Sequence, residues 1–277
     1  DLQQKYIIEV EDFGEKNITL GQLLGSNEFK ELYHYDGQLG AIYNKEATTF
    51  KLWAPLASKV SLILFKRGDG KNQYATHDMN KGIYNDDYER NENGVWSLQL
   101  KGDYSGVYYN YLVTNDNETF EVTDPYAKAV GVNGYRGMVI DSEITNPSEW
   151  GIYKRPEALK AINSIIYEMN IRDLTSDKNS MPYGISREKY SGVWKSGTSY
   201  LETGIKTGLD HIKELGVTHI HFLPFADNKD IDETKESPDL YNWGYKTINF
   251  NTPEGSYSLD PYNGNGRIKE LKEMILE

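Results

Sequence analysis

The hydrophobic periodicity of the chain changes near residue 146, and this change constrains the fold more than any other feature. Between residues 36 and 140, short segments of alternating apolar and polar residues are separated by clusters of Gly, Asn and Asp. Such segments at this spacing are typical of an antiparallel β-sandwich. We expect strands at 49–53, 59–65, 95–100, 106–113 and 119–122.

One of these segments indicates where the core of the sandwich lies. Val107, Tyr109, Tyr111 and Val113 alternate along a single strand, so they share one face of it. We expect that face to be buried between the sheets.

The first 35 residues are too short to fold alone. They hold a strand-like stretch at 6–10 and a helix-like stretch at 20–24. We therefore expect segment 1–35 to pack onto the sandwich at 36–145.

After a polar linker at 146–163, which contains Pro147 and Pro156, the pattern becomes that of alternating strands and helices. The stretch 164–172 is apolar nearly throughout and predicts a buried strand. Apolar residues at helical spacing predict a helix over 203–215 that ends at Gly216, followed by a strand over 217–223.

These three elements make one βαβ unit. A long loop rich in Asp, Tyr and Asn is expected over 224–265, and a second helix over 267–276. An eight-fold barrel needs roughly 250 residues, more than twice as many as segment 164–277 contains. We expect a barrel that is incomplete in this chain, with the remainder either on a second polypeptide or missing from a shortened one.

Composition excludes several classes of function. With 30 Lys and Arg against 42 Asp and Glu, the net charge is −12, so nucleic acid is not an expected partner. The absence of cysteine rules out disulfides, thiolate zinc sites and a thiolate nucleophile. No apolar run approaches the ~18 to 20 residues that span a bilayer, so no membrane partner is expected.

The start of the chain and its lack of cysteine also bear on the cellular location. The chain begins at Asp1, shows no signal peptide and lacks cysteine, which favours a cytoplasmic protein. It would be extracellular if a signal peptide had been removed.

Aromatic residues are abundant: 22 Tyr, 5 Trp and 8 Phe make 13% of the chain. Rings with an apolar face and a polar tip suit sugars, whose C–H faces stack while their hydroxyls need hydrogen bonds. A β-rich core also favours Tyr and Trp, so composition alone leaves both interpretations open.

The most specific local signal is the sequence YNWGY at 241–245, followed by NTPEGSYS at 251–258. It lies in the loop after the second strand, and loops at the carboxyl ends of barrel strands form the active-site face. Three aromatic rings and Asn242 could form a sugar platform there. Aromatic packing within the loop is the alternative.

Other candidate residues are fewer and more isolated. Glu168 and Asp173 could serve as an acid/base pair beside the first strand. His219 and His221 have the spacing that places two imidazoles on one metal ion, as in amidohydrolase-type barrels. Trp53 and Trp96 could be surface rings that bind sugar, or Trp53 could fill a contact between domains. No phosphate-binding loop motif occurs.

The segments YNWGY and NTPEGSYS closely resemble the signature of type I pullulanases, debranching enzymes of the α-amylase superfamily. Other stretches agree in order, including FKLWAP at 50–55, IIYEMNIRD at 165–173 and GVTHIHFLP at 216–224. The resemblance runs from about Tyr33 to the end of the chain. It implies a sandwich of the carbohydrate-binding module 48 type, followed by the first part of a (β/α)8 barrel.

The resemblance also implies an activity. The family hydrolyses α-1,6 branch links in pullulan, starch and glycogen by the retaining route, with two carboxyl groups ~5 Å apart. Its catalytic carboxylates come from barrel strands four, five and seven, so we expect no catalytic residue in this chain and no activity from it alone. A non-catalytic α-glucan-binding protein is the alternative. No cofactor or metal is expected.

Residue by residue, Tyr245 matches the tyrosine that stacks on the sugar beside the bond to be cut, in subsite −1. Asn242 and Trp243 match its neighbours in the cleft, and Tyr241 is expected to bind substrate with them. The family's Asp or Asn followed by Pro is here Lys246 and Thr247. A cation at this place changes the charge of the cleft, and the loss of proline loosens the loop.

Overall fold

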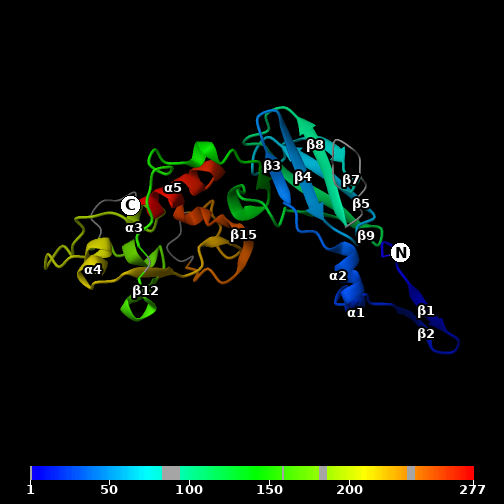
Figure 1. The fold of residues 1–277 in the computed structure, drawn as a ribbon, viewed down its shortest axis with the longest axis horizontal. Coiled ribbons are helices and arrows are strands. Elements are labelled where there is room, and N and C mark those ends of the chain that lie inside the picture. Colours follow the sequence, from blue (N-terminus) through cyan, green and yellow to red (C-terminus); the bar gives the residue numbers. More distant parts are fainter. Residues whose placement is uncertain (1, 83–93, 158, 181–185, 236–240) are drawn as a thin grey trace.

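The computed structural model describes residues 2–82, 94–157, 159–180, 186–235 and 241–277. The molecule is elongated (Figure 1): a β-sandwich occupies one end, and a mixed α/β portion, here called the C-terminal unit (residues 164–277), occupies the other. A two-stranded hairpin at the N-terminus projects from the sandwich. None of the helices in these described ranges is long and apolar enough to cross a membrane.

The sandwich consists of two antiparallel sheets. One has the strand order β3-β4-β8-β7 and the other β10-β9-β5-β6, with β11 paired to β9. The strands are β3 (Gly40–Tyr43), β4 (Ala47–Trp53), β5 (Lys59–Phe65), β6 (Gln73–Asp78), β7 (Asn80–Lys81), β8 (Val95–Lys101), β9 (Tyr108–Asn115), β10 (Glu118–Val122) and β11 (Gly137–Met138). Each of the five predicted strands is present within two residues of its expected ends, so the β-sandwich is confirmed.

Tyrosine side chains fill much of the core between the sheets. Tyr109 and Tyr111 on β9 are fully buried, as the alternation predicted. The ring of Tyr109 meets Phe50 of the opposite sheet edge to face, with centroids 5.0 Å apart. Both tyrosine hydroxyls donate to the buried carboxylate of Asp124, at 2.8 and 3.3 Å. Buried hydroxyls that find an acceptor avoid the cost of an unpaired polar group.

The N-terminal segment divides into two parts. Helix α2 (Asn27–Tyr33) lies against the sandwich: Phe29 is buried beside Trp53, whose indole N–H donates to the Tyr33 carbonyl at 2.9 Å. The short helix α1 (Gly21–Leu24) precedes it and has no buried residue. The hairpin of β1 (Ile7–Val10) and β2 (Gly14–Asn17) is exposed along its whole length. Packing onto the sandwich therefore involves α2 and not the hairpin.

The C-terminal unit contains the predicted βαβ element. Strands β12 (Ile166–Met169) and β13 (His219–Phe222) are parallel, and α4 (Gly208–Glu214) precedes β13. Gly216 ends the helix with φ of +73°, a left-handed conformation that glycine adopts without strain. The helix starts five residues later than expected, because Gly204 has a positive φ and Lys206 pairs with Ser199 in an isolated antiparallel bridge.

The prediction that the first strand is buried throughout is wrong for the described residues. Ile166 is 66% exposed, Tyr167 is half-buried against the core, and Met169, at the carboxyl end, is buried. The strand pairs with β13 alone among the described strands. The core of the unit is formed by Met169, Ile171, Tyr190, Val193, Ile212, Tyr257 and Met274.

The prediction of one long loop over 224–265 is also wrong for the residues of this range that the structure describes. This stretch contains β14 (Ala226–Asn228) and β15 (Thr247–Pro253), which pair antiparallel across a long connection with two register shifts. The helix α5 (Gly264–Leu276) follows, capped by the Asn263 side chain, which accepts from the Gly266 N–H at 2.9 Å. Further helical segments include α3 (Tyr190–Val193) and the 3₁₀ turns Val132–Gly134, Glu143–Thr145, Ala161–Asn163, Asp173–Thr175 and Gly255–Tyr257.

The sandwich and the C-terminal unit share a polar interface. Asn249 on β15 donates to the Gly134 carbonyl at 3.0 Å, and the Thr252 hydroxyl donates to the Ala127 carbonyl at 3.0 Å. Both donors are buried. The turn at 131–134, contributed by the sandwich, thus reaches into the C-terminal unit.

Candidate functional site

A cleft of about 490 Å³ lies at the carboxyl ends of β12 and β13. Its walls include Glu168 and Asn170 from the first strand and the turn after it, and Leu223, which follows the second strand. Another wall is formed by Tyr241, Trp243 and Tyr245, which belong to residues 241–245, here called the aromatic loop. The sequence predicted this placement, because the ends of parallel strands meet at one edge of the sheet.

Three rings of the aromatic loop line the cleft. Tyr241, Trp243 and Tyr245 are 44%, 61% and 68% exposed, so their faces are open to a ligand. All three line the same cleft, so they lie on the same side of the loop. This arrangement brings together three of the four predicted substrate-binding residues.

Tyr241 is held in place by polar contacts with the turn after β12. Its hydroxyl donates to Asp173 at 2.8 Å, and the Arg172 guanidinium lies 5.7 Å from its ring centroid. Partial burial and the Asp173 contact raise the pKa of Tyr241 to about 12, so it stays a neutral donor at physiological pH. Its ring orientation is therefore fixed before any ligand arrives.

Asn242, the fourth predicted residue, does not line the cleft. Its side chain is buried and donates from Nδ2 to Oδ1 of Asn228 at 2.9 Å, while its own Oδ1 accepts from the Gly244 N–H at 2.5 Å. Both ends of the amide are therefore occupied by the protein. The side chain therefore holds the aromatic loop from the side that faces the protein interior.

Gly244 is required by the shape of the aromatic loop. Its φ is +90°, and a Cβ atom at this position would overlap the Pro224 carbonyl oxygen. The loop therefore passes directly over the end of β13, with no space for a side chain.

Lys246, where the family carries an acidic or amide residue, is paired. Its ammonium lies 2.8 Å from Asp230, with the lysine side chain 70% exposed. It is not among the residues that line the cleft. Its charge is balanced by Asp230 rather than directed at the aromatic rings.

Glu168 and Asp173 both line the cleft, but Asp173 accepts the Tyr241 hydroxyl. His219 and His221 lie on the exposed side of β13. Within the described ranges, no third carboxylate, imidazole or thiolate lies close enough to make them a metal-binding group.

The two tryptophans proposed as surface rings of the sandwich, Trp53 and Trp96, differ in how exposed they are. Trp96 is only 7% exposed and its indole N–H donates to the Ala54 carbonyl at 3.1 Å, so it is a core residue and not a surface ring. Trp53 remains 41% exposed beside α2.

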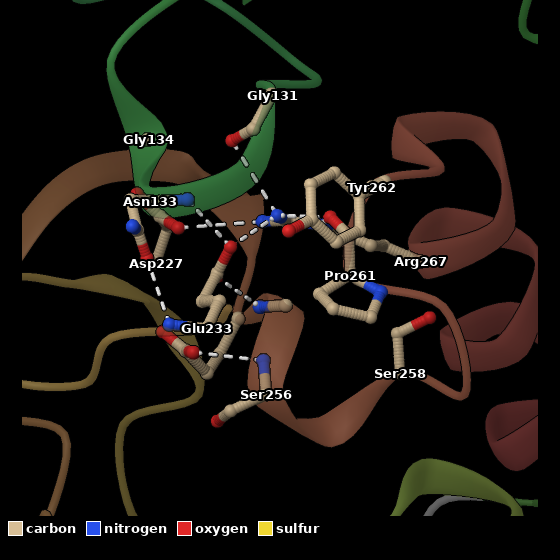
Figure 2. Close-up of polar contacts among 12 residues, drawn as sticks. Gly131, Asn133, Gly134, Asp227, Glu233, Ser256, Ser258, Pro261, Tyr262 and Arg267 are labelled. Atoms are coloured by element: carbon tan, nitrogen blue, oxygen red, sulfur yellow. Dashed lines mark hydrogen bonds and ion pairs between the residues drawn. The ribbon is translucent and has the colours of Figure 1, made fainter. Parts of the chain in front are cut away.

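A buried charged group that the sequence analysis missed lies behind the cleft; it is here called the carboxylate–arginine cluster and is shown in part in Figure 2. Arg267 is completely buried; it contacts Asp227 at 3.4 Å and Glu233 at 2.5 Å. Glu254, the fourth member, has a carboxylate oxygen within 4.8 Å of those of Asp227 and Glu233. Three carboxylates so close together could ligate a metal ion, but here the cation is the guanidinium of Arg267.

Burial and mutual repulsion perturb the acids of this cluster. Burial, followed by the charge of Glu233, raises the pKa of Asp227 to about 7 and that of Glu254 to about 8. One arginine cannot neutralise three carboxylates in a dry site, so part of the cluster is protonated near neutral pH. Glu254 belongs to the NTPEGSYS motif, which was the one sequence signal that could have pointed here.

Comparison with known proteins identifies the first domain. Residues 38–127 match the model of carbohydrate-binding module 48, described as the isoamylase N-terminal domain. The match covers the sandwich from β3 to the turn after β10.

Relatives and solved structures extend the similarity to the C-terminal unit. The pullulanase of Bacillus subtilis (strain 168) is 35% identical over 259 residues, covering 94% of this chain and 33% of the relative. The pullulanase of Bacillus acidopullulyticus superimposes with a TM-score of 0.87 at 35% identity, covering all of this chain and 32% of the other. That of Paenibacillus barengoltzii, solved with maltohexaose and α-cyclodextrin, gives 0.83 at 39% identity, covering 93% and 39%.

The chain therefore contains a carbohydrate-binding module 48 domain, joined to a unit with the fold found at the same place in pullulanases. Over most of its length it is homologous to type I pullulanases, as the aromatic loop motif suggested. It spans about a third of the length of the Bacillus subtilis relative.

Proposed function

We propose that this chain is the N-terminal part of a type I pullulanase, which hydrolyses α-1,6 branch links of pullulan and other α-glucans. The observation that carries the proposal is the cleft with Tyr241, Trp243 and Tyr245 at the carboxyl ends of β12 and β13. A homologous pullulanase has been solved with maltohexaose, a linear α-glucan, which supports this class of ligand.

In this proposal the exposed rings of the aromatic loop bind the glucan. Tyr245, the most exposed, stacks on the sugar in subsite −1, and Trp243 extends the platform. Tyr241 offers its ring from a position fixed by Asp173. Such rings orient the reacting sugar by contact with its C–H face, while hydroxyl groups are left to polar neighbours.

The chemistry is proposed to follow the retaining route, in which one carboxylate attacks the anomeric carbon and a second serves as acid and then base. We assign neither role to a residue of this chain. The first half of a barrel holds the sugar, and the carboxylates come from later strands. The barrel in this chain is proposed to be incomplete, so the 277 residues alone bind glucan without cutting it.

The rival proposal is a glucan-binding protein that never cuts its ligand. Release of reducing sugar from pullulan separates the two, measured for the 277-residue chain alone and again after a polypeptide carrying the rest of a homologous barrel is added. We expect none from the chain alone and some from the mixture. Activity of the chain alone would show that the barrel assignment is wrong, and an inactive but stably associated mixture would favour the rival.

The role of Tyr245 is tested by isothermal titration calorimetry with maltotriose. Replacement Tyr245→Ala removes the ring and should weaken binding by roughly 5- to 150-fold, the value of ~1 to 3 kcal/mol for stacking on an aromatic. Tyr245→Phe keeps the ring and should bind within a few-fold of the unmodified chain.

The matched control is Phe120→Ala, which removes an exposed aromatic ring from β10 of the sandwich. It should leave maltotriose binding unchanged. If Tyr245→Ala binds as well as the unmodified chain while Phe120→Ala does not, the sugar site lies on the sandwich and not in the cleft.

A further inference from the structure

The aromatic loop is held from behind by a chain of three buried polar side chains. Asn242 donates to Oδ1 of Asn228 at 2.9 Å. The backbone N–H and the side-chain amide of Asn228 both donate to Oε2 of Glu254, at 2.9 and 3.0 Å. All three side chains are buried.

Glu254 is a fixed anchor for this chain. Its second carboxylate oxygen accepts from the Ser256 N–H at 2.9 Å, and its backbone carbonyl accepts from the Tyr190 hydroxyl at 3.0 Å. Each carboxylate oxygen thus faces N–H donors, and this fixes the direction in which the amide of Asn228 points. Asn228 must then present its oxygen, and not its nitrogen, to Asn242.

The anchor is itself tied to the sandwich. Glu233 accepts from the Gly255 N–H through Oε1 at 2.9 Å, and through Oε2 from the Asn133 N–H at 2.7 Å. Figure 2 shows Asn133 and Gly131, on the sandwich turn, facing Glu233 and Arg267. The support of the aromatic loop therefore continues into the module domain.

At the other end, Asn242 sits between two rings of the cleft. Tyr241 precedes it and Trp243 follows it, so the backbone that carries both rings is fixed by the inward-facing amide. Its Oδ1 also accepts from Gly244, whose backbone lies tight against Pro224. Loss of the Asn242 contacts would release the loop at the point where the rings are attached.

We propose that Asn242, Asn228 and Glu254 form a positioning device for the aromatic platform, in which Asn242 orients the rings and does not contact the glucan. The inference rests on the proposed function for the identity of the ligand. The placement of the rings, by contrast, is a property of the protein alone and can be measured without any sugar. A donor–acceptor order fixed by Glu254 makes the device sensitive to exchange of a single amide for a carboxylate.

The test uses Asn242→Asp in the 277-residue chain labelled with 5-fluorotryptophan. This change keeps the shape of the side chain but sets a carboxylate oxygen against Oδ1 of Asn228. The fluorine resonance of Trp243, assigned by its loss in Trp243→Phe, should shift or broaden in the absence of sugar. Maltotriose affinity should fall by roughly 5- to 30-fold, as expected when one buried hydrogen bond becomes a repulsive contact.

The matched control is Asn251→Asp, on β15. Asn251 is exposed and donates a hydrogen bond to the Pro125 carbonyl at 3.2 Å, on the side of the sandwich. This variant should leave both the Trp243 resonance and maltotriose affinity unchanged. If Asn242→Asp fails to fold, Asn242→Ser replaces it, since a hydroxyl still accepts from Gly244 but cannot reach Asn228.

The outcomes separate this inference from the proposed function. A Trp243 resonance unmoved by either Asn242 variant, with or without weaker binding, overturns the positioning role, and weaker binding alone would make Asn242 a direct ligand of the sugar. A shifted resonance in a chain whose unmodified form does not bind maltotriose supports positioning and refutes the glucan ligand. A shift together with weakened binding supports both.

Discussion

At the scale of single residues, the shape of the cleft depends on a position where the backbone accepts only glycine. Gly244 combines a φ of +90° with a Pro224 carbonyl oxygen that occupies the place of a Cβ. Gly244→Ala should therefore lower the free energy of unfolding by roughly 1 to 3 kcal/mol, or displace the aromatic loop at a similar cost. Chemical denaturation and the fluorine resonance of Trp243 measure the two effects.

Gly151 offers the comparison for this prediction. It lies in the linker, its φ is outside the left-handed region, and no heavy atom lies within 4 Å of the position that a Cβ would take. Gly151→Ala should be neutral or slightly stabilising, because alanine has fewer unfolded conformations to lose. Equal effects at both positions would mean that the loop is not constrained as described.

At the scale of elements, the local sequence pattern predicted most strands and helix ends correctly, but it did not predict strands that pair over a long separation in the chain. Strand β5 and the C-terminal end of α4 at Gly216 follow from alternation and from glycine at a helix end. The pair β14 and β15 was missed for two reasons. Strand β14 is only three residues long, and in β15 the polar Asn249 and Thr252 are buried while Ile248 and Phe250 are exposed. The two strands also pair across a long connection with register shifts. These strands form because their polar side chains find partners in the interface. The alternation of apolar and polar residues in the sequence does not reveal those partners.

At the scale of the whole molecule, the carboxylate–arginine cluster links pH to stability. The pKa values of Asp227 and Glu254, about 7 and about 8 in the folded protein, are above their ordinary values of 3.8 and 4.5. Between about pH 4 and pH 8 the folded state holds more protons than the unfolded state, so the free energy of unfolding falls as pH rises through this window. The slope from each fully titrating group is at most about 1.4 kcal/mol per pH unit.

This prediction is checked by guanidinium denaturation at several pH values, followed by circular dichroism. Asp227→Asn is nearly isosteric and does not titrate, so its stability should decline less steeply between about pH 5 and pH 8, a window set by the raised pKa values. If the free energy of unfolding of the variant and of the unmodified protein changed in parallel with pH, Asp227 would be ionised throughout this range. Stability that instead rises with pH over this range would refute the raised pKa values altogether.

The sandwich strands, the βαβ element and the aromatic residues of the cleft could be predicted from the sequence, because each depends on short-range periodicity or on an uninterrupted motif. The contacts of Asn242, Glu254 and Arg267 could be learned only from the folded protein. A buried amide or charge is stable only where its partners lie, and those partners come from distant segments: Glu233 meets Asn133 from a turn 100 residues earlier. No local pattern records such a meeting, so the same asparagine that looked like a sugar ligand in the sequence faces inward in the folded chain.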